Sequence, residues 1–79
     1  MIQRYPIGMV TWNLKPILDE RKITRYALSK RSGLAMGTIY AMYDNRSKQV
    51  GLETLSSLLK ALRELTGEEV DMGDVLRYT

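Results

Sequence analysis

Cysteine and histidine are both absent from this chain of 79 residues. Without cysteine there is no disulfide and no thiolate nucleophile, and without histidine there is no imidazole base or Cys/His zinc site. No hydrophobic run approaches the roughly 20 residues that cross a bilayer, and the N-terminal segment lacks a secretory hydrophobic region. We therefore expect a cytoplasmic protein that needs no metal or other cofactor and has no membrane partner.

The residues that are present are typical of one small folded domain. Hydrophobic residues make up 44% of the chain and charged residues 27%, a balance that favours a folded domain over a disordered tail. A chain of this length buries only about 60–65% of its unfolded surface. Its stability is expected to be small, and dimerisation would increase it.

Positive charge is concentrated in the first part of the chain. Residues 1–46 hold eight basic and three acidic side chains, whereas residues 47–79 hold four basic and six acidic ones. The basic part is suited to a polyanion such as nucleic acid. An ordinary solvated surface with a chance asymmetry explains the same numbers, so charge alone does not decide between the two.

The pattern of apolar residues is mainly helical. It predicts helices at about residues 14–22, 25–31, 36–43, 52–65 and 72–77, with Asn13, Thr24 and Asp71 as N-caps. Residues 1–10 lack this periodicity and form either an extended N-terminal arm or a short edge strand. We therefore predict an all-α fold of four to five short helices at residues 11–79, with no strand predicted firmly.

The strongest periodic signal lies in residues 52–65. Six leucines there are predicted to share one side of a helix, namely Leu52, Leu55, Leu58, Leu59, Leu62 and Leu65. A stripe of this kind indicates a face that packs against the core. Trp12 is expected to cover an edge of that core.

The second and third predicted helices have the spacing of a helix-turn-helix. Ser32 and Gly33 end the second helix, because glycine accepts the left-handed conformation in which the chain reverses. Leu34 is expected to fill the turn. The outer face of the third helix would then be free to enter the major groove of DNA, which is wide enough for one helix.

This part of the sequence resembles a known family. The run TRYALSKRSGL at residues 24–34, the pair Thr38-Ile39, and the segments LETL at 52–55 and LKAL at 59–62 are similar to the Cro/CI-type helix-turn-helix domain of the XRE family. The resemblance covers about residues 14–62. It implies a compact lambda-repressor-like fold of five helices, binding to double-stranded DNA, and usually a homodimer on a two-fold operator.

The resemblance also implies a set of DNA-binding residues. They are Arg25 at the start of the second helix, Met36, Gly37, Thr38, Tyr40 and Ala41 on the third, and Arg46 and Lys48 in the loop after it. Ala35 replaces the family's usual Ser cap. Met36 and Gly37 replace polar reading residues, so base recognition would depend on Tyr40, on thymine methyl groups and on DNA shape.

We therefore expect a sequence-specific transcriptional regulator that places residues 36–43 in the major groove, and the resemblance implies a repressor. The alternative is an antitoxin or a protein-interaction adaptor built on the same fold, with a protein partner. An enzyme is not expected, because the sequence contains no paired-carboxylate motif, no phosphate-binding glycine loop and no metal-ligand spacing.

Overall fold

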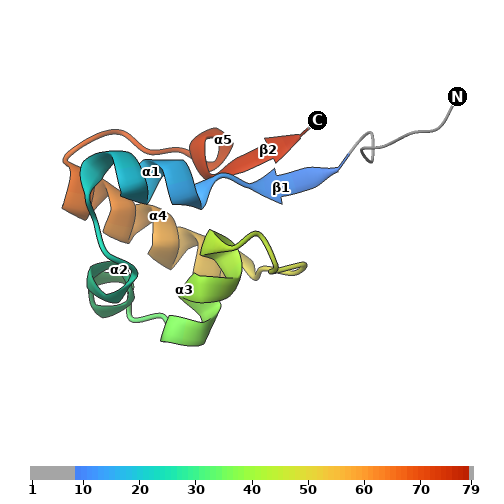
Figure 1. Cartoon of the computed structure of the whole chain (residues 1–79), viewed down its shortest axis with the longest axis horizontal. Coiled ribbons are helices and arrows are strands. Elements are labelled where there is room, and N and C mark those ends of the chain that lie inside the picture. The colour runs from blue at the N-terminus through green and yellow to red at the C-terminus, as the bar shows by residue number, and fades with distance from the viewer. Residues whose placement is uncertain (1–8, 79) are drawn as a thin grey trace, which may run out of the picture.

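The computed structural model describes residues 9–78 (Figure 1). In chain order its elements are β1 (Val10–Trp12), α1 (Leu14–Arg21), α2 (Arg25–Ser32), α3 (Met36–Tyr43), α4 (Leu52–Thr66), α5 (Met72–Val75) and β2 (Leu76–Tyr78). In the view of Figure 1, α2 and α3 lie at the bottom, and α1, α5 and the two strands lie at the top. The prediction of a mainly helical, lambda-repressor-like domain of five helices is confirmed.

Local signals place the ends of α2 and α3 where the sequence predicts them. The Thr24 side chain accepts a hydrogen bond from the backbone N–H of Ala27 at 3.0 Å and so caps α2. Gly33 ends the helix with a φ of 77°. The α3 helix begins after Ala35 without any side-chain cap, as the loss of the usual Ser implies. Asn45 follows α3 in the left-handed conformation, with a φ of 59°.

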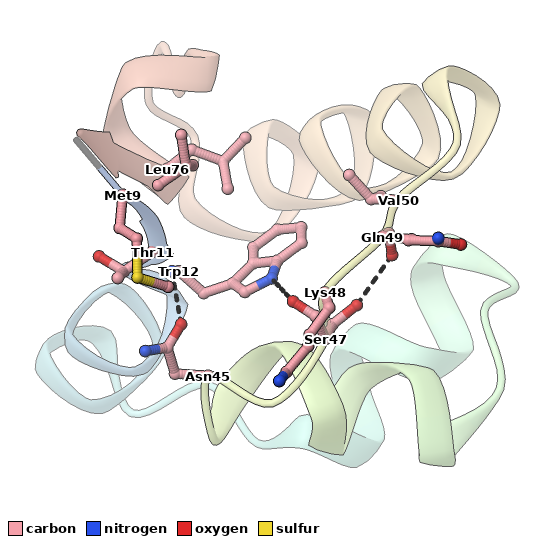
Figure 2. A pocket seen from close by; sticks show the side chains of 10 residues that line it. Met9, Thr11, Trp12, Asn45, Ser47, Lys48, Gln49, Val50 and Leu76 are labelled. Atoms are coloured by element: carbon pink, nitrogen blue, oxygen red, sulfur yellow. Dashed lines mark hydrogen bonds between the residues drawn. The ribbon is translucent and has the colours of Figure 1, made fainter. Parts of the chain in front are cut away.

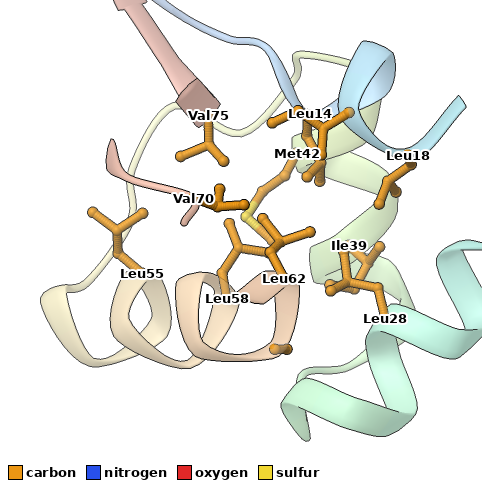
Figure 3. Close-up of a cluster of buried hydrophobic side chains, with 12 residues drawn as sticks. Leu14, Leu18, Leu28, Ile39, Met42, Leu55, Leu58, Leu62, Val70 and Val75 are labelled. Carbon is orange, nitrogen blue, oxygen red and sulfur yellow. The ribbon is translucent and has the colours of Figure 1, made fainter. Parts of the chain in front are cut away.

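The core is a single cluster formed by all five helices and the loop before α5. Figure 3 shows side chains from these elements pointing toward one another. Its fully or almost fully buried members are Leu14, Ile17, Leu18, Leu28, Ile39, Met42, Leu55, Leu58, Ala61, Leu62, Val70 and Val75. Trp12 packs against the edge of the cluster, as predicted.

The leucine stripe of α4 is confirmed except at its first residue. Leu55, Leu58 and Leu62 are buried, and Leu59 and Leu65 pack partly against the core. Leu52, however, is 82% exposed, so the expectation that it joins the stripe is wrong. It is the first residue of α4, and the buried part of the helix begins at Leu55.

The C-terminal end of the domain differs from the sequence prediction. The last helix was expected to reach residue 77, but α5 ends at Val75 and the chain continues as β2. Leu76 and Tyr78 pair antiparallel with Trp12 and Val10 of β1, respectively. We name this two-stranded sheet the ribbon. Pairing with a strand more than 60 residues away decides the conformation of this segment, and local periodicity does not contain that information.

Hydrogen bonds of Asn13, just before α1, hold the start of that helix against α5. Asn13 stands at the N-cap of α1, but its side chain makes no capping bond. Its amide group donates instead to the Asp74 carbonyl at 3.3 Å, and its backbone N–H donates to the Val75 carbonyl at 2.7 Å. Asp71 precedes α5 as predicted, and its backbone N–H donates to the Asp74 carboxylate at 2.9 Å. The two Asn13 bonds fix α5 against the start of α1, and the Asp71 bond closes the first turn of α5.

The predicted N-terminal arm falls mostly outside the described residues, which begin at Met9. Within the described part of that segment, Val10 belongs to β1. Among residues 9–78, no helix has both the length and the apolar character that spanning a bilayer requires.

Candidate nucleic-acid interface

The turn between α2 and α3 holds the two helices in a fixed relation. The Ser29 hydroxyl donates to the Leu34 carbonyl at 2.6 Å, and the Ser32 hydroxyl accepts from the Leu34 N–H at 3.1 Å. Leu34 packs partly against the core, as predicted. With Gly33 in the left-handed conformation, these contacts reverse the chain within a few residues. The result is the geometry of a helix-turn-helix.

The two sides of α3 differ in exposure. Ile39 and Met42 are buried and hold the helix against the core. Gly37, Thr38 and Tyr40 are exposed on the other side. This arrangement leaves one flank of α3 open to solvent, as the prediction of a groove-binding helix requires.

The predicted site residues lie on this flank and around it. Gly37, Thr38, Tyr40, Arg46 and Lys48 are exposed, whereas Arg25, Met36 and Ala41 are partly buried. The guanidinium carbon of Arg25, the first residue of α2, lies 4.3 Å from the centroid of the Tyr40 ring on α3. The structure therefore brings these two residues of the predicted set into contact.

The loop after α3 carries the two predicted phosphate-binding residues, and the ribbon holds it in place. The Trp12 indole N–H donates to the Ser47 carbonyl at 2.9 Å, and the Trp12 backbone N–H donates to the Asn45 side chain at 2.8 Å (Figure 2). Lys48 follows in the same loop. Arg46 also forms an exposed ion pair with Asp44, at 3.5 Å. Such a pair is weak in water, so the Arg46 guanidinium is available to a stronger anion.

A second tyrosine connects α1 to the site. Tyr43 donates its hydroxyl to the Asp19 carboxylate at 2.6 Å. This hydrogen bond, together with burial, raises the pKa of Tyr43 above its ordinary value. The Tyr43 ring also lies beneath the Lys15 ammonium, 5.7 Å from the ring centroid, and beneath the Arg25 guanidinium, at 4.8 Å.

Lys15 is the cation that the sequence analysis missed. It stands in α1, and Tyr43 lies at the end of α3, so the contact joins residues 28 positions apart. No spacing rule within one helix signals such a contact, because only residues three or four apart are neighbours there. In the sequence, Lys15 is one of the eight basic residues of the first 46, and nothing distinguishes it from the others as a site residue.

The arrangement is suited to binding a polyanion. Arg25 lies against Tyr40 on the exposed flank of α3, and Lys15 lies over Tyr43 at the end of that helix. Arg46 and Lys48 follow in the next loop. Within the part of the chain that the structure describes, no group of three acidic side chains is placed to hold a metal ion. Positive groups around an open helix are the basis of phosphate contact in helix-turn-helix proteins.

Comparison with known proteins agrees with this geometry. The profile of the Cro/C1-type HTH DNA-binding domain matches residues 13–79. The chain is also similar to YozG of Bacillus subtilis (strain 168), which is described as an uncharacterized HTH-type transcriptional regulator. The two are 32% identical over 66 residues, which are 84% of this chain and 71% of YozG. No solved structure matches the chain.

The matched family is one of DNA-binding domains and not of enzymes, as expected. Its match begins at Asn13 and includes every helix of the fold. The sequence motifs, the open flank of α3 and the family match lead to the same conclusion: this chain belongs to the Cro/C1-type helix-turn-helix DNA-binding domain family.

Proposed function

We propose that this domain is a transcriptional regulator that binds operator DNA by placing α3 in the major groove. The observation that carries the proposal is the exposed flank of α3. Arg25 of α2 contacts Tyr40 on this flank, and Arg46 and Lys48 stand in the loop that follows α3. The similarity to a protein described as an HTH-type transcriptional regulator supports the same function.

Two kinds of contact are assigned to the site. Arg46 and Lys48 bind phosphates, as does the Thr38 hydroxyl, and these contacts fix the position of the domain on the duplex. Met36, Gly37, Tyr40 and Ala41 face the bases. Since three of these four carry no hydrogen-bonding side chain, discrimination by α3 itself depends on thymine methyl groups and on DNA shape. Affinity is then dominated by the backbone contacts.

We further propose that the domain acts as a homodimeric repressor. Two copies place their α3 helices about 34 Å apart, one turn of DNA, on a two-fold operator. Bound there, the dimer blocks access of the polymerase to an overlapping promoter. A dimer also compensates for the limited core of a single short chain.

The ribbon offers the surface for the second copy. Residues directly opposite each other in an antiparallel pair share a face, and so do alternate residues of one strand. Val10, Trp12, Leu76 and Tyr78 therefore form one apolar face. Its inner half, Trp12 and Leu76, packs on the core. Its outer half is open, with Val10 57% and Tyr78 74% exposed.

A groove of about 320 Å³ continues this apolar surface. Figure 2 shows it between the ribbon and the loop after α3, with Met9, Trp12 and Val50 among its lining residues. A two-stranded ribbon is marginally stable on its own, so burial of its outer half by a second copy stabilises both strands. A symmetric dimer buries the same patch on each copy.

The salt dependence of duplex binding tests the function. Each neutralised phosphate contributes a slope of about −0.9 to the logarithm of affinity against that of salt. A protomer in which Arg46 and Lys48 neutralise two phosphates therefore loses roughly 12-fold in affinity between about 50 and about 200 mM salt. Fluorescence anisotropy with a labelled duplex measures this loss. A flat response, with a tight protein partner, would favour the antitoxin or adaptor alternative.

Two substitutions separate the two kinds of contact. Arg46→Ala should weaken binding to all duplexes alike and reduce the salt slope by about one, whereas Tyr40→Ala should change the preferred sequence. Lys60→Ala is the matched control, because Lys60 is an exposed cation on α4 and is not part of the site. The assignment of this interface is wrong if the Arg46 and Tyr40 variants both bind like the parent.

A further inference from the structure

The exposed flank of α3 lacks a side chain that can form two parallel hydrogen bonds with one base. Met36, Gly37 and Ala41 have no hydrogen-bonding group suited to this, and Thr38 and Tyr40 each have a single hydroxyl. Paired hydrogen bonds provide most of the direct discrimination in the major groove. If the domain recognises a defined operator, a neighbouring element has to supply them.

Arg25 on α2 has the required chemistry and is not engaged elsewhere. Among residues 9–78 it forms no ion pair within 4.0 Å, whereas Arg21, Arg31, Arg46 and Arg63 each have an acidic partner. The described residues also provide no hydrogen-bond acceptor for its guanidinium group. Its five N–H donors are therefore available to a ligand.

Helix stability does not explain an arginine at this position. Arg25 is the first residue of α2, and the first turn of that helix contains no acidic residue. A positive charge there lies at the positive end of the helix dipole, which is unfavourable. The contacts of Arg25 are instead with two aromatic rings of α3, those of Tyr40 at 4.3 Å and Tyr43 at 4.8 Å.

These rings hold the guanidinium group beside the groove-facing flank. Contact with an aromatic face uses the plane of a guanidinium group and leaves its N–H edge free. Tyr43 is anchored through its hydroxyl to Asp19, so its ring is fixed. Tyr40 is exposed on the flank that the proposed function places in the groove. A group that rests on Tyr40 is therefore directed toward the same groove.

From this geometry we propose that Arg25 reads a guanine in each half-site, with Tyr40 as the platform that positions its guanidinium group. Arginine donates two parallel hydrogen bonds to O6 and N7 of guanine, which no other base accepts in the same way. The inference rests on the proposed function, because it takes the placement of α3 in the major groove as given. It assigns the paired hydrogen bonds of operator readout to α2 and leaves the contacts with thymine methyl groups to α3.

Selection from random duplex DNA with the full chain tests this inference. The parent should enrich guanine at one position of each half-site, at least about fivefold over every other base. Arg25→Gln removes the paired donors that match O6 and N7 of guanine, so it should abolish this preference. It should leave the salt slope unchanged, because the lost group does not neutralise a phosphate. Lys22→Gln, a change of an exposed cation outside the site, should retain the preference.

Substitutions of Tyr40, the platform, provide a second measurement. It remains informative even where an Arg25 variant does not fold, because Arg25 itself is unchanged. Tyr40→Phe keeps the ring and should keep the guanine preference, whereas Tyr40→Leu removes the ring and should reduce it. Thermal unfolding followed by circular dichroism confirms that each variant is folded before its sites are selected.

Three results would overturn the inference. The first is a parent that binds duplex DNA without enriching guanine, and the second is Arg25→Gln with the parent's guanine preference intact. The third is an Arg25→Gln variant that loses affinity equally for all sequences and whose salt slope is smaller by about one. If Arg25→Lys restores that affinity, Arg25 contacts a phosphate and not a base. Failure of the proposed function is distinct, because the parent itself would then show no salt-dependent binding to duplex DNA.

Discussion

At the scale of single residues, Arg21 illustrates how exposed side chains hold the C-terminal part of the fold. It donates to both carboxylate oxygens of Glu68, at 3.0 and 2.7 Å, and to the Ile17 carbonyl at 3.2 Å. The hydrogen bond to Arg21 lowers the pKa of Glu68, and the same bond raises the pKa of Arg21. The pair therefore ties α1 to the loop between α4 and α5.

This pair predicts a dependence of stability on pH. Because the pKa of Glu68 is lower in the folded state, its contribution to stability is complete above the ordinary glutamate pKa and is lost as pH falls through the lowered one. Glu68→Gln should therefore unfold at a lower temperature than the parent at neutral pH. The two should converge at a pH below the lowered pKa of Glu68, where its side chain is protonated in both states.

Thermal unfolding at the two pH values measures this difference. Glu69→Gln is the control, because the Glu69 carboxylate is 88% exposed and lies 3.8 Å from its partner, Arg63. It should unfold nearly as the parent does at both pH values. A constant difference between Glu68→Gln and the parent across the whole range would show that the ionised pair has no role.

At the scale of elements, the two helices of the motif begin differently. Thr24 caps α2 through its hydroxyl, whereas Ala35 leaves the first N–H groups of α3 without a side-chain acceptor. Ala35 already has the extended backbone of an N-cap, with φ −64° and ψ 148°. A serine at this position needs no change of backbone in order to cap the helix.

We expect Ala35→Ser to stabilise the domain by about 1 kcal/mol. For a domain of this size, that corresponds to an increase of roughly 4–8 °C in the unfolding temperature. Thr24→Ala, which removes the existing cap of α2, should destabilise the domain by a similar amount. Urea unfolding of the three proteins measures both changes. Equal midpoints for the parent and Ala35→Ser would mean that water already satisfies the start of α3.

At the scale of the whole molecule, the ribbon and the helix-turn-helix are the two surfaces that a second copy and a duplex would use. Figure 1 shows the ribbon at the top of the molecule and α2 and α3 at the bottom. The ribbon and the two helices of the motif therefore occupy different parts of the surface, and Lys48 lies where the groove beside the ribbon meets the loop after α3. The apolar outer half of the ribbon, with Val10 and Tyr78, makes the dimer testable separately from DNA binding.

We expect Tyr78→Ser to weaken the proposed dimer. Tyr78 is exposed in the single chain, so its replacement leaves the core intact. Since both copies lose the apolar contact, the dissociation constant should rise at least about tenfold. Sedimentation velocity over a range of concentrations measures this change. Arg77→Ser is the matched control, because Arg77 points to the other face of the ribbon and should leave the equilibrium unchanged.

The sequence by itself determined the helices of the motif and its likeness to a known family. Thr24, Gly33 and Asn45 act on the backbone within a few residues, and the leucines of α4 repeat within one helix. Such interactions join residues that are close in the sequence, so the sequence alone indicates them. For this reason α2, α3 and α4 follow their predicted bounds closely.

Only the tertiary structure decided which distant groups meet. In the folded domain Leu76–Tyr78 form a strand and Leu52 is exposed to solvent. The Asn13 side chain donates a hydrogen bond to Asp74 and does not cap α1. The tertiary structure also brings Arg25 and Lys15 to the tyrosines of α3. Each of these outcomes depends on how separate elements pack together, and the spacing of residues along one element does not encode that packing.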